Sequence, residues 1–346
     1  MSPRPPARHT YVDESGVEAA RAGDPGAFER LAEPYRHELQ VHCYRMLGSI
    51  EDAEDVVQET YLRAWARLDS YAGRASFRAW LYGIATHACL DALRRRKARV
   101  WPSDISGPGD PHGRPAPPVE LPWLQPYPDR LLDAAAPSDT EPEALVTSKE
   151  TIELAFLASI QRLPARQRAV LIMRDVLDWS AKDTADSLGT TAAGVNSALQ
   201  RARATLAEHL SVGRSAWTSQ SSEAERLLLK QLITAWEQSD ATALVALLRA
   251  DARLVMPPRP TWYSGRDDIG VFFREHVFAE MGDGWALRPT RANRQPAVAV
   301  YWRAPGTLEH RPFGIGVLGI DGDAVAEIAM FVQPDLFPRF ALPSSP

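Results

Sequence analysis

Residues 101–129, WPSDISGPGDPHGRPAPPVELPWLQPYPD, constrain the fold most, because they separate two stretches with helical periodicity. Proline removes a backbone donor and blocks helix interiors, so a segment this rich in Pro and Gly excludes a long helix or a central strand. We predict a linker over residues 101–140, extended where Pro is densest. A chain of 346 residues divided in this way is expected to form two or three domains.

The stretch before the linker, residues 17–100, is predicted to be helical. Pro25 fits the first turn of an early helix that Asp24 caps. Apolar side chains then recur at helical spacing around Leu39–Leu47, over Asp52–Leu68 and over Phe77–Arg96. Charges come in blocks, with an acidic run over residues 51–59 and a basic run over residues 94–99.

Composition bears on which classes of protein this chain can belong to. Hydrophobic residues make up 45% of the chain and charged residues 24%, the balance of a soluble globular protein. No window approaches the roughly 18–20 apolar residues of a membrane span, and residues 1–16, which we expect to be a disordered tail, lack the apolar core of a secretory signal. The net charge of −5 does not exclude DNA binding, because local patches set the phosphate contacts.

Cysteine usage indicates a reducing cytoplasm. The chain has two cysteines, Cys43 and Cys89, and no CxxC, which excludes a disulfide scaffold and a four-cysteine zinc site. A zinc site of His42, Cys43, His87 and Cys89 is the alternative, but both cysteines fall on apolar helical faces, so core packing is favoured. We expect no metal and no cofactor.

The strongest local signal is Ser180–Leu206, SAKDTADSLGTTAAGVNSALQRARATL. Ser180 is placed to cap a short helix, Gly189 to make a tight turn, and Thr190 or Thr191 to cap a second helix. Two helices around a short Gly-containing turn form a helix-turn-helix, whose second helix lies in the major groove. Asn and Gln pair with adenine there, and Arg with guanine. An ordinary helical hairpin with a solvated polar face is the structural alternative.

Residues 222–337 mix the two kinds of periodicity. Two helices are expected first, over Glu223–Ser239 and Thr242–Leu248. Strand-like runs follow at Ala252–Met256, Ala297–Trp302, Phe313–Ile320 and Val325–Phe331. Asp321-Gly322-Asp323 between the last two runs is a hairpin signal. The block is therefore predicted to be an α+β domain.

Three segments together resemble the sigma-70 family of RNA polymerase sigma factors, of the small extracytoplasmic-function (ECF) type. LPARQRAVLIMRDVLDWSAKDTADSLGTTAAGVNSALQRARATL, from Leu163, resembles region 4. AFERLAEPYRHELQVHCYRMLGSIEDAEDVVQETYLRAWARLDSY resembles regions 2.1 and 2.2, and SFRAWLYGIATHACLDALRRR resembles regions 2.3 and 2.4. The segments stand in the family's order, with a linker where region 3 would be.

The resemblance implies three contact surfaces. The surface for the β′ subunit of core polymerase is expected at Asp55, Gln58, Glu59 and Leu62, which share one helix face. Base flipping and strand contacts at the −10 element are expected at Tyr71, Arg74, Ser76, Arg78, His87, Asp91, Arg94, Arg95, Arg96 and Lys97. The −35 element is expected to meet Asn196, Ser197, Gln200, Arg201 and Arg203. Trp80 lies on the apolar side of its helix, so we favour a core position for it.

The sequence departs from the family pattern at a few of these positions. Gly83 and His87 stand where Arg and Asn are frequent, which leaves the −10 base preference open. Asn196 and Ala198 stand where basic residues are frequent, so a weaker phosphate grip on −35 DNA is expected.

The C-terminal block resembles the SnoaL-like branch of the cone fold named after nuclear transport factor 2. The resemblance rests on the opening helical pair, on Trp236–Asp240 and on SGRDDI from Ser264. The ending DLFPRFALP is like the tail of sigma factors that carry this domain. Such cones enclose an apolar cavity, which Trp236, Met256, Trp262, Tyr263, Phe272, Trp302 and Phe331 are candidates to line. Asp267, Asp268 and His276 would be its acid/base groups if the cone were catalytic.

The sequence thus predicts a multidomain chain, with two all-α sigma domains followed by an α+β SnoaL-like cone. The boundaries are a tail at 1–16, region 2 at 17–100, the linker at 101–140, region 4 at 141–212, the cone at 222–337 and a tail at 338–346. The expected function is transcription initiation without covalent chemistry, in the cytoplasm, as a monomer bound to the β and β′ subunits of core polymerase and to promoter DNA. The cone is expected to regulate in cis, through Trp262 and Phe337, and an anti-sigma protein or a small ligand is left open as a further partner. The alternatives are a ligand-sensing helix-turn-helix regulator and a polyketide-cyclase-like enzyme.

Overall fold

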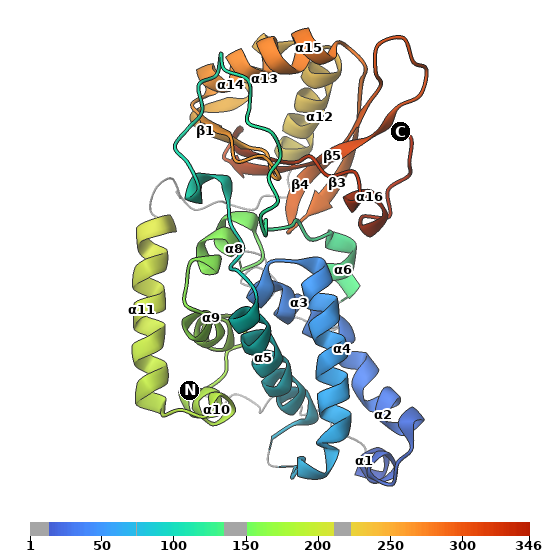
Figure 1. Ribbon diagram of the computed structural model, residues 1–346, viewed down its shortest axis with the longest axis vertical. Coiled ribbons are helices and arrows are strands. Elements are labelled where there is room, and N and C mark those ends of the chain that lie inside the picture. Colours follow the sequence, from blue (N-terminus) through green and yellow to red (C-terminus); the bar gives the residue numbers. More distant parts are fainter. Residues whose placement is uncertain (1–13, 74, 135–150, 211–222) are drawn as a thin grey trace. The chain divides into compact units, whose positions relative to one another are not determined.

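The computed structural model describes residues 14–73, 75–134, 151–210 and 223–346 (Figure 1). Contacts divide the chain into two compact units. The helical unit comprises residues 1–97, 134–140 and 163–203, and the C-terminal unit comprises residues 98–133, 141–162 and 204–346. Parts of several predictions lie outside the described residues: most of the N-terminal tail, Arg74, the end of the linker with the start of region 4 at 135–150, and residues 211–222.

The first part of the helical unit has the helices that periodicity predicted. Their ends are set by local signals: Asp24, Ser49 and Ser76 each accept a hydrogen bond from a backbone N–H of the following helix, and Gly48 ends a helix at a φ of 67°. The elements are α1 (Glu14–Arg21), α2 (Pro25–Ala32), η1 (Glu33–Tyr35), α3 (Arg36–Leu47), α4 (Ile50–Ala66), η2 (Leu68–Ser70) and α5 (Phe77–Arg95).

The helix-turn-helix packs in the same unit, and its local signals are confirmed. Ser180 accepts a hydrogen bond from the Asp183 N–H, Gly189 turns the chain at a φ of 60°, and Thr191 accepts from the Gly194 N–H. The elements are α9 (Ala165–Leu171), the π-helical turn η4 (Ile172–Val176), α10 (Ala181–Leu188) and α11 (Ala192–Leu210).

A buried arginine joins the two parts of the helical unit. Arg168 on α9 is 2% exposed and donates to the backbone oxygens of Met46 and Leu163. Burial lowers the pKa of Arg168 to about 10, which still leaves the guanidinium charged at neutral pH. The end of α3 and the start of α9 are therefore held together by hydrogen bonds to a buried charge.

The C-terminal unit is built on a six-stranded mixed sheet. The strand order is β2-β1-β6-β5-β4-β3, with β1 and β6 parallel and the other pairs antiparallel. The strands are β1 (Leu248–Val255), β2 (Trp262–Ser264), β3 (Trp285–Ala292), β4 (Gln295–Trp302), β5 (Arg311–Asp321) and β6 (Ala324–Phe331). The predicted hairpin is confirmed, because Asp321 pairs with Ala324 across Gly322.

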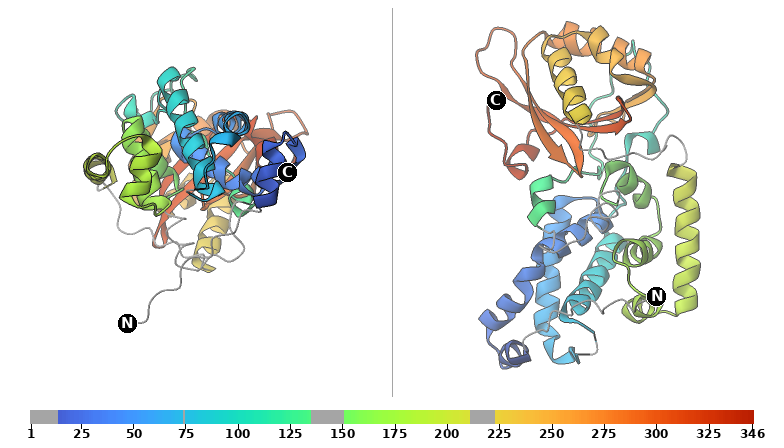
Figure 2. Two further views of the ribbon diagram at one scale, coloured as in Figure 1. Left: turned by 90° about the horizontal axis from the view of Figure 1, so that it is seen from below. Right: turned by 180° about the vertical axis from the view of Figure 1, so that it is seen from behind.

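Helices cover one face of this sheet and enclose its main core (Figures 1 and 2). They are α12 (Glu223–Glu237), α13 (Ala241–Ala246), α14 (Arg266–Phe272), the π-helical turn η5 (Phe273–Phe278) and α15 (Ala279–Met281). A last short helix, α16 (Leu336–Arg339), packs against β5 and buries Leu336 and Phe337. The predicted order of helical domains followed by an α+β domain is confirmed.

Two strands, β2 and β3, were not predicted from the sequence. β2 has three residues, too few for a periodic signal, and β3 carries charged and partly exposed side chains at its centre. The predicted helix over Thr242–Leu248 ends earlier, at Ala246, because Leu248 already belongs to β1.

The described part of the linker is docked on the C-terminal unit. The Gly109 N–H donates to the Trp262 oxygen at 2.7 Å, and the Val119 N–H donates to the Pro258 oxygen at 3.0 Å. The ring of Trp101 lies 6.0 Å from that of Phe331. Two short helices form within the segment, η3 (Pro102–Asp104) and α6 (Asp129–Ala134), the second where no proline interrupts the chain after Pro128. A further helix, α8 (Leu154–Gln161), also belongs to this unit.

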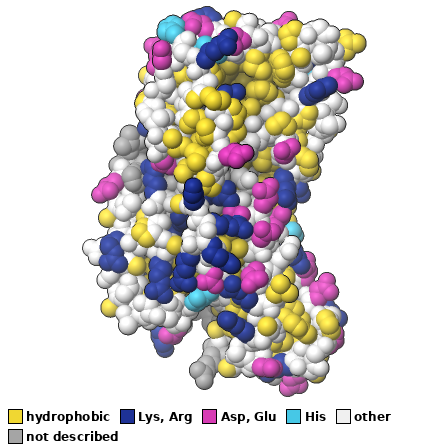
Figure 3. Space-filling model, viewed as in Figure 1, with side chains coloured by type: hydrophobic (Ala, Val, Ile, Leu, Met, Phe, Trp, Pro, Cys, Tyr) yellow, Lys and Arg dark blue, Asp and Glu magenta, His cyan; other side chains and the backbone are white. Residues whose placement is uncertain are grey.

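Surface character differs between faces of the two units. On the face in Figure 3, hydrophobic side chains gather over the C-terminal unit, whereas Lys and Arg side chains gather over the helical unit. Within the described ranges, every helix is too short or too polar to cross a membrane.

Candidate nucleic-acid interface

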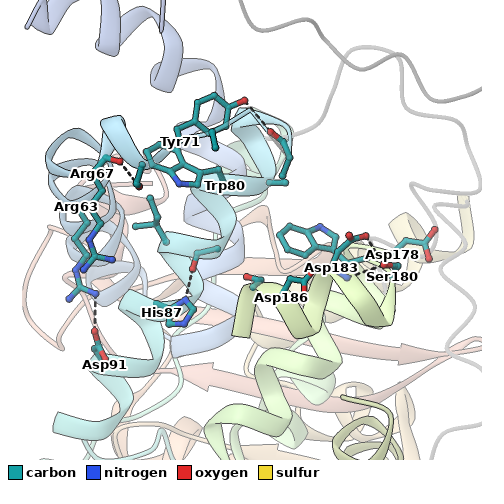
Figure 4. Close-up of a pocket in the computed structure, with 18 residues that line it drawn as sticks. Arg63, Arg67, Tyr71, Trp80, His87, Asp91, Asp178, Ser180, Asp183 and Asp186 are labelled. Atoms are coloured by element: carbon teal, nitrogen blue, oxygen red, sulfur yellow. Dashed lines mark hydrogen bonds and ion pairs between the residues drawn. The ribbon is translucent and has the colours of Figure 1, made fainter. Parts of the chain in front are cut away.

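A groove of about 1150 Å³ opens in the helical unit between α5 and the start of the helix-turn-helix (Figure 4). One wall carries Tyr71, Trp80 and His87, with Arg63 and Arg67 beside them, and the other wall carries Asp178, Ser180, Asp183 and Asp186. The groove therefore has an aromatic, partly basic wall that faces an acidic one.

The aromatic wall is a small cluster of rings at the start of α5. The Tyr71 ring lies 5.5 Å from that of Phe77 and 5.3 Å from that of Trp80, and its hydroxyl donates to the Ala75 oxygen at 3.1 Å. Phe77 is fully buried and anchors the cluster, whereas Trp80 and Tyr71 remain partly exposed in the groove. Trp80 is therefore only partly in the core that we favoured for it, and the open face of its ring is available for stacking.

His87 and Gly83 occupy successive turns of α5 along the groove. His87 is exposed, and its Nδ1 lies 3.0 Å from the Gly83 oxygen. A Cβ atom at Gly83 would lie 3.2 Å from the Ser187 hydroxyl of α10, so the missing side chain is what permits this close approach. Asp91 continues the row and pairs with Arg63 at 2.8 Å and Arg94 at 3.1 Å.

The other residues expected at the −10 element are spread around the groove. Ser76 caps α5 through its hydroxyl, 3.1 Å from the Ala79 N–H. Arg78 forms a forked ion pair with Glu38, with N···O distances of 2.8 Å. Burial lowers the pKa of Arg78, but the pair with Glu38 and the interaction with Tyr82 outweigh burial and raise it. The basic run at the end of α5 is exposed, and Arg96 within it pairs with Asp52 on α4. The structure thus places Tyr71, His87 and Asp91 in the groove and Arg78 outside its lining.

The five residues expected at the −35 element lie exposed on α11, while Val195 and Leu199 are buried beneath them. Arg203 is held by Asp175 of the π-helical turn at 2.6 Å, and this pair raises the pKa of Arg203. Arg201 and Gln200 project from the preceding positions of the same exposed face. The arrangement suits a recognition helix that meets a duplex.

The surface expected for core polymerase is a mixed acidic and apolar face of α4. Asp55, Gln58 and Leu62 are exposed, and Glu59 is partly exposed and pairs with Arg63 at 2.7 Å. Leu62 is 67% exposed, so a large apolar side chain stands at the surface within this acidic face.

A separate cavity of about 240 Å³ lies inside the C-terminal unit. Of the seven side chains expected to line it, Trp236, Met256 and Phe272 do so, and the described lining does not include the other four. Tyr263 and Phe331 are buried elsewhere in the core, and Trp262 donates from Nε1 to the Ser106 oxygen of the linker at 2.8 Å. Phe337 is buried 5.1 Å from the Tyr301 ring.

The four residues of the alternative zinc site are split between two environments. His42 is fully buried, and its Nε2 lies 2.9 Å from the Thr86 hydroxyl, while burial lowers its pKa to about 3. Cys43 and Cys89 are also fully buried, whereas His87 is exposed.

The acidic wall of the groove was missed by sequence reasoning. Asp183 and Asp186 lie on the first helix of the helix-turn-helix, and Asp178 precedes that helix. Their alternation with apolar residues is visible in the sequence. It reads as an ordinary solvated face until the tertiary fold brings it opposite Trp80.

Comparison with known proteins supports the resemblance to sigma-70 factors. Residues 31–99 match the family model of sigma-70 region 2, and residues 153–206 match that of sigma-70 region 4. The ECF RNA polymerase sigma factor SigG of Mycobacterium tuberculosis is 42% identical over 337 residues, which cover 96% of this chain and 88% of that protein.

Two further likenesses cover different parts of the molecule. The ECF RNA polymerase sigma factor SigM of Mycobacterium tuberculosis is 33% identical over 205 residues, covering 59% of this chain and 87% of that protein. The crystal structure of the extracytoplasmic function sigma factor SigJ of the same organism matches with a TM-score of 0.59 at 22% identity, covering 89% of this chain and 98% of that chain.

Proposed function

The chain belongs to the ECF RNA polymerase sigma factors, and we propose that it binds core RNA polymerase and opens promoters with the three surfaces of its helical unit, under the control of its C-terminal unit. The groove between α5 and α10 carries the proposal, because it exposes rings where a strand-separating factor needs them.

In this scheme α4 is the polymerase contact. Leu62 supplies the apolar centre of the surface, and Asp55 and Glu59 supply negative charge for a basic partner. Apolar anchors surrounded by charges are the usual anatomy of a protein interface.

Strand separation is assigned to the aromatic wall. Bases that leave the duplex stack on the open faces of Tyr71 and Trp80, with His87 and Arg67 close to the path of the strand. Stacking of one base on an aromatic side chain contributes about 1–3 kcal/mol. The basic end of α5, Arg94–Lys97, lies exposed for phosphate contacts.

Reading of the −35 duplex is assigned to α11, through Asn196, Ser197, Gln200, Arg201 and Arg203. In the described arrangement the acidic wall of α10 borders the strand groove, so negative charge opposes DNA entry until the helix-turn-helix moves away. The free chain is therefore expected to bind promoter duplex weakly at physiological salt.

Control in cis is assigned to the linker that the C-terminal unit holds. Residues 98–133 join the two groups of helices in sequence, and their backbone is hydrogen-bonded to the C-terminal unit at Trp262, Pro258 and Asn293. A segment held in this way cannot be extended freely, so its docking limits the positions available to the helix-turn-helix. Residues 101–140 would run through the polymerase when released.

Transcription from a fixed promoter with purified core enzyme tests the proposal. Tyr71→Ala and Trp80→Ala are expected to reduce permanganate reactivity of the −10 thymines by about fivefold to 100-fold, as the stacking energy implies. Lys182→Ala, at an exposed position of α10 outside the groove lining, is the matched control. Normal promoter opening by both aromatic variants would refute the assignment of the groove.

Truncation after residue 212 tests control in cis. Removing residues 213–346 takes away the sheet to which the linker is hydrogen-bonded, so transcription on the same promoter is expected to change. A truncation before Asp335 then separates the effect of the final segment, where Arg130 of the linker donates to the Arg339 oxygen at 2.6 Å. Unchanged transcription by both truncated chains would refute control in cis.

A further inference from the structure

The cavity of the C-terminal unit is enclosed by apolar and aromatic side chains from its helices and strands. Trp236 comes from α12, Phe272 from α14, Phe273 from η5, Trp285 from β3 and Met330 from β6. The Trp236 ring meets Phe273 edge-on at 4.8 Å and lies 6.2 Å from Trp285. The cavity is therefore shaped by rings that hold one another in place.

Three ring nitrogens of the lining residues lack hydrogen-bond partners. Nε1 of Trp236, Nε1 of Trp285 and Nε2 of His276 are buried, and none of the described residues bonds to them. Trp236 is 3% exposed, Trp285 is 5% exposed, and the His276 side chain is 9% exposed. The two indole N–H groups are donors, and a buried donor without a partner costs free energy, so two of them around one cavity indicate a missing acceptor. His276 Nε2 donates or accepts according to the tautomer of the ring, whose Nδ1 faces Glu280.

The contrast with neighbouring rings makes this pattern specific. Trp302 Nε1 donates to the Met281 oxygen at 3.0 Å, Trp262 Nε1 to the Ser106 oxygen at 2.8 Å, and Trp123 Nε1 to the Val119 oxygen at 3.0 Å. The indole nitrogens of Trp302, Trp262 and Trp123, outside the cavity lining, are thus satisfied by the protein itself, while those of Trp236 and Trp285 are not.

The linker supplies part of the cavity wall. Pro115 lines it, and the next residue is fixed on both sides: the Ala116 N–H donates to the Thr261 hydroxyl, and Arg259 donates to the Ala116 oxygen, both at 2.8 Å. The charged groups near the cavity are engaged as well, since Glu280 pairs with His276 at 3.3 Å and with Arg114 at 3.7 Å.

We propose that this cavity binds a small, uncharged aromatic molecule that carries a hydrogen-bond acceptor for the unpaired ring nitrogens. A cavity of about 150 Å³ takes up benzene, so a volume of 240 Å³ suits a bicyclic molecule of about ten non-hydrogen atoms. The mainly apolar lining favours an uncharged molecule, because its charged members Arg259 and Glu280 are already engaged with the Ala116 oxygen and with His276 and Arg114. Occupancy stabilises the docked linker, because Pro115 contacts the ligand only when the linker is in place.

Coumarin and naphthalene are a matched pair of probes for the full-length chain, without polymerase or DNA, so the test does not depend on the proposed sigma activity. The two are nearly equal in size, but only coumarin has a carbonyl acceptor. Titration calorimetry is expected to give coumarin about a tenfold tighter dissociation constant, as one buried hydrogen bond implies. Trp236→Phe and Trp285→Phe keep a ring and remove an indole donor, so each should reduce this preference.

Trp302→Phe is the control, because it removes an indole nitrogen of the same unit that the protein already satisfies. It should leave both affinities unchanged, with thermal melting used to verify that each variant folds. Failure of coumarin to bind up to its solubility limit, or equal affinity of the two probes, would overturn the proposal. An effect of Trp302→Phe as large as that of the lining variants would overturn it too, and if one lining variant does not fold, the other decides.

Discussion

Asn293 holds the linker from inside the core. Its side chain is fully buried and bonds two separate segments of the chain: Oδ1 accepts from the Tyr127 N–H at 2.7 Å, and Nδ2 donates to the Ile152 oxygen at 2.8 Å. It stands in the turn between β3 and β4 at a φ of 57°, a left-handed conformation that Asn tolerates better than most residues. We therefore expect Asn293→Ala to release the linker.

The magnitude follows from these contacts. Asn293→Ala leaves one buried N–H and one buried carbonyl unpaired, at about 1–3 kcal/mol each, and adds about 1 kcal/mol for alanine at a positive φ. We expect the free energy that keeps the Tyr127 segment docked to fall by about 4 kcal/mol. Asn293→Gly loses the same two bonds without the cost at φ, so it should be about 1 kcal/mol less destabilising.

Amide hydrogen exchange at Tyr127 measures this free energy directly. A loss of about 4 kcal/mol corresponds to roughly a thousandfold faster exchange where opening is local. Leu308→Ala is the control, because Leu308 lies in the loop between β4 and β5 and is 92% exposed. Unchanged protection of the Tyr127 amide in Asn293→Ala would refute the reasoning that this side chain holds the linker.

Three further predictions concern the helical unit. If Arg201 contacts a base edge, Arg201→Ala should weaken −35 recognition by about 1–3 kcal/mol in competition binding. If Arg201 contacts phosphate, the substitution should lower affinity evenly across sequences and reduce the salt dependence of binding. No change in sequence preference or in salt dependence would remove Arg201 from the site. Burial lowers the pKa of His42 from 6.5 to about 3, so the contribution of neutral His42 to stability is full above pH 6.5 and is lost as the pH falls towards 3. Lowering the pH from 7 to 5 should therefore reduce the free energy of unfolding by about 2 kcal/mol through His42 alone. In urea titrations at the two pH values, His42→Gln should lack that part of the loss. Leu62→Asp should weaken binding of core polymerase at least tenfold, whereas Asp69→Asn, at another exposed position on η2, should not. Equal affinities of the two variants would exclude α4 as the contact surface.

Local chemistry explains what could be predicted from the sequence. Helix periodicity, the caps at Asp24, Ser76 and Ser180, and the left-handed turn at Gly189 all depend on residues within a few positions of one another. The helix-turn-helix, the three helices of the first block and the final hairpin could therefore be located before any tertiary contact was known. The surfaces of α4 and α11 followed because an exposed helix face is set by the same short-range period.

Long-range contacts decided the rest. Nothing near Tyr127 in sequence indicates that it meets a turn at Asn293, and the Pro-rich segment would read as an extended linker whether or not a sheet were there to hold it. Of the expected cavity residues, Trp262 and Phe331 lie outside the main core because strand register, which depends on partners far along the chain, determines which side of a strand faces inward. The acidic wall opposite Trp80 arises in the same way, from helices that are distant in sequence and packed together by a buried Arg168.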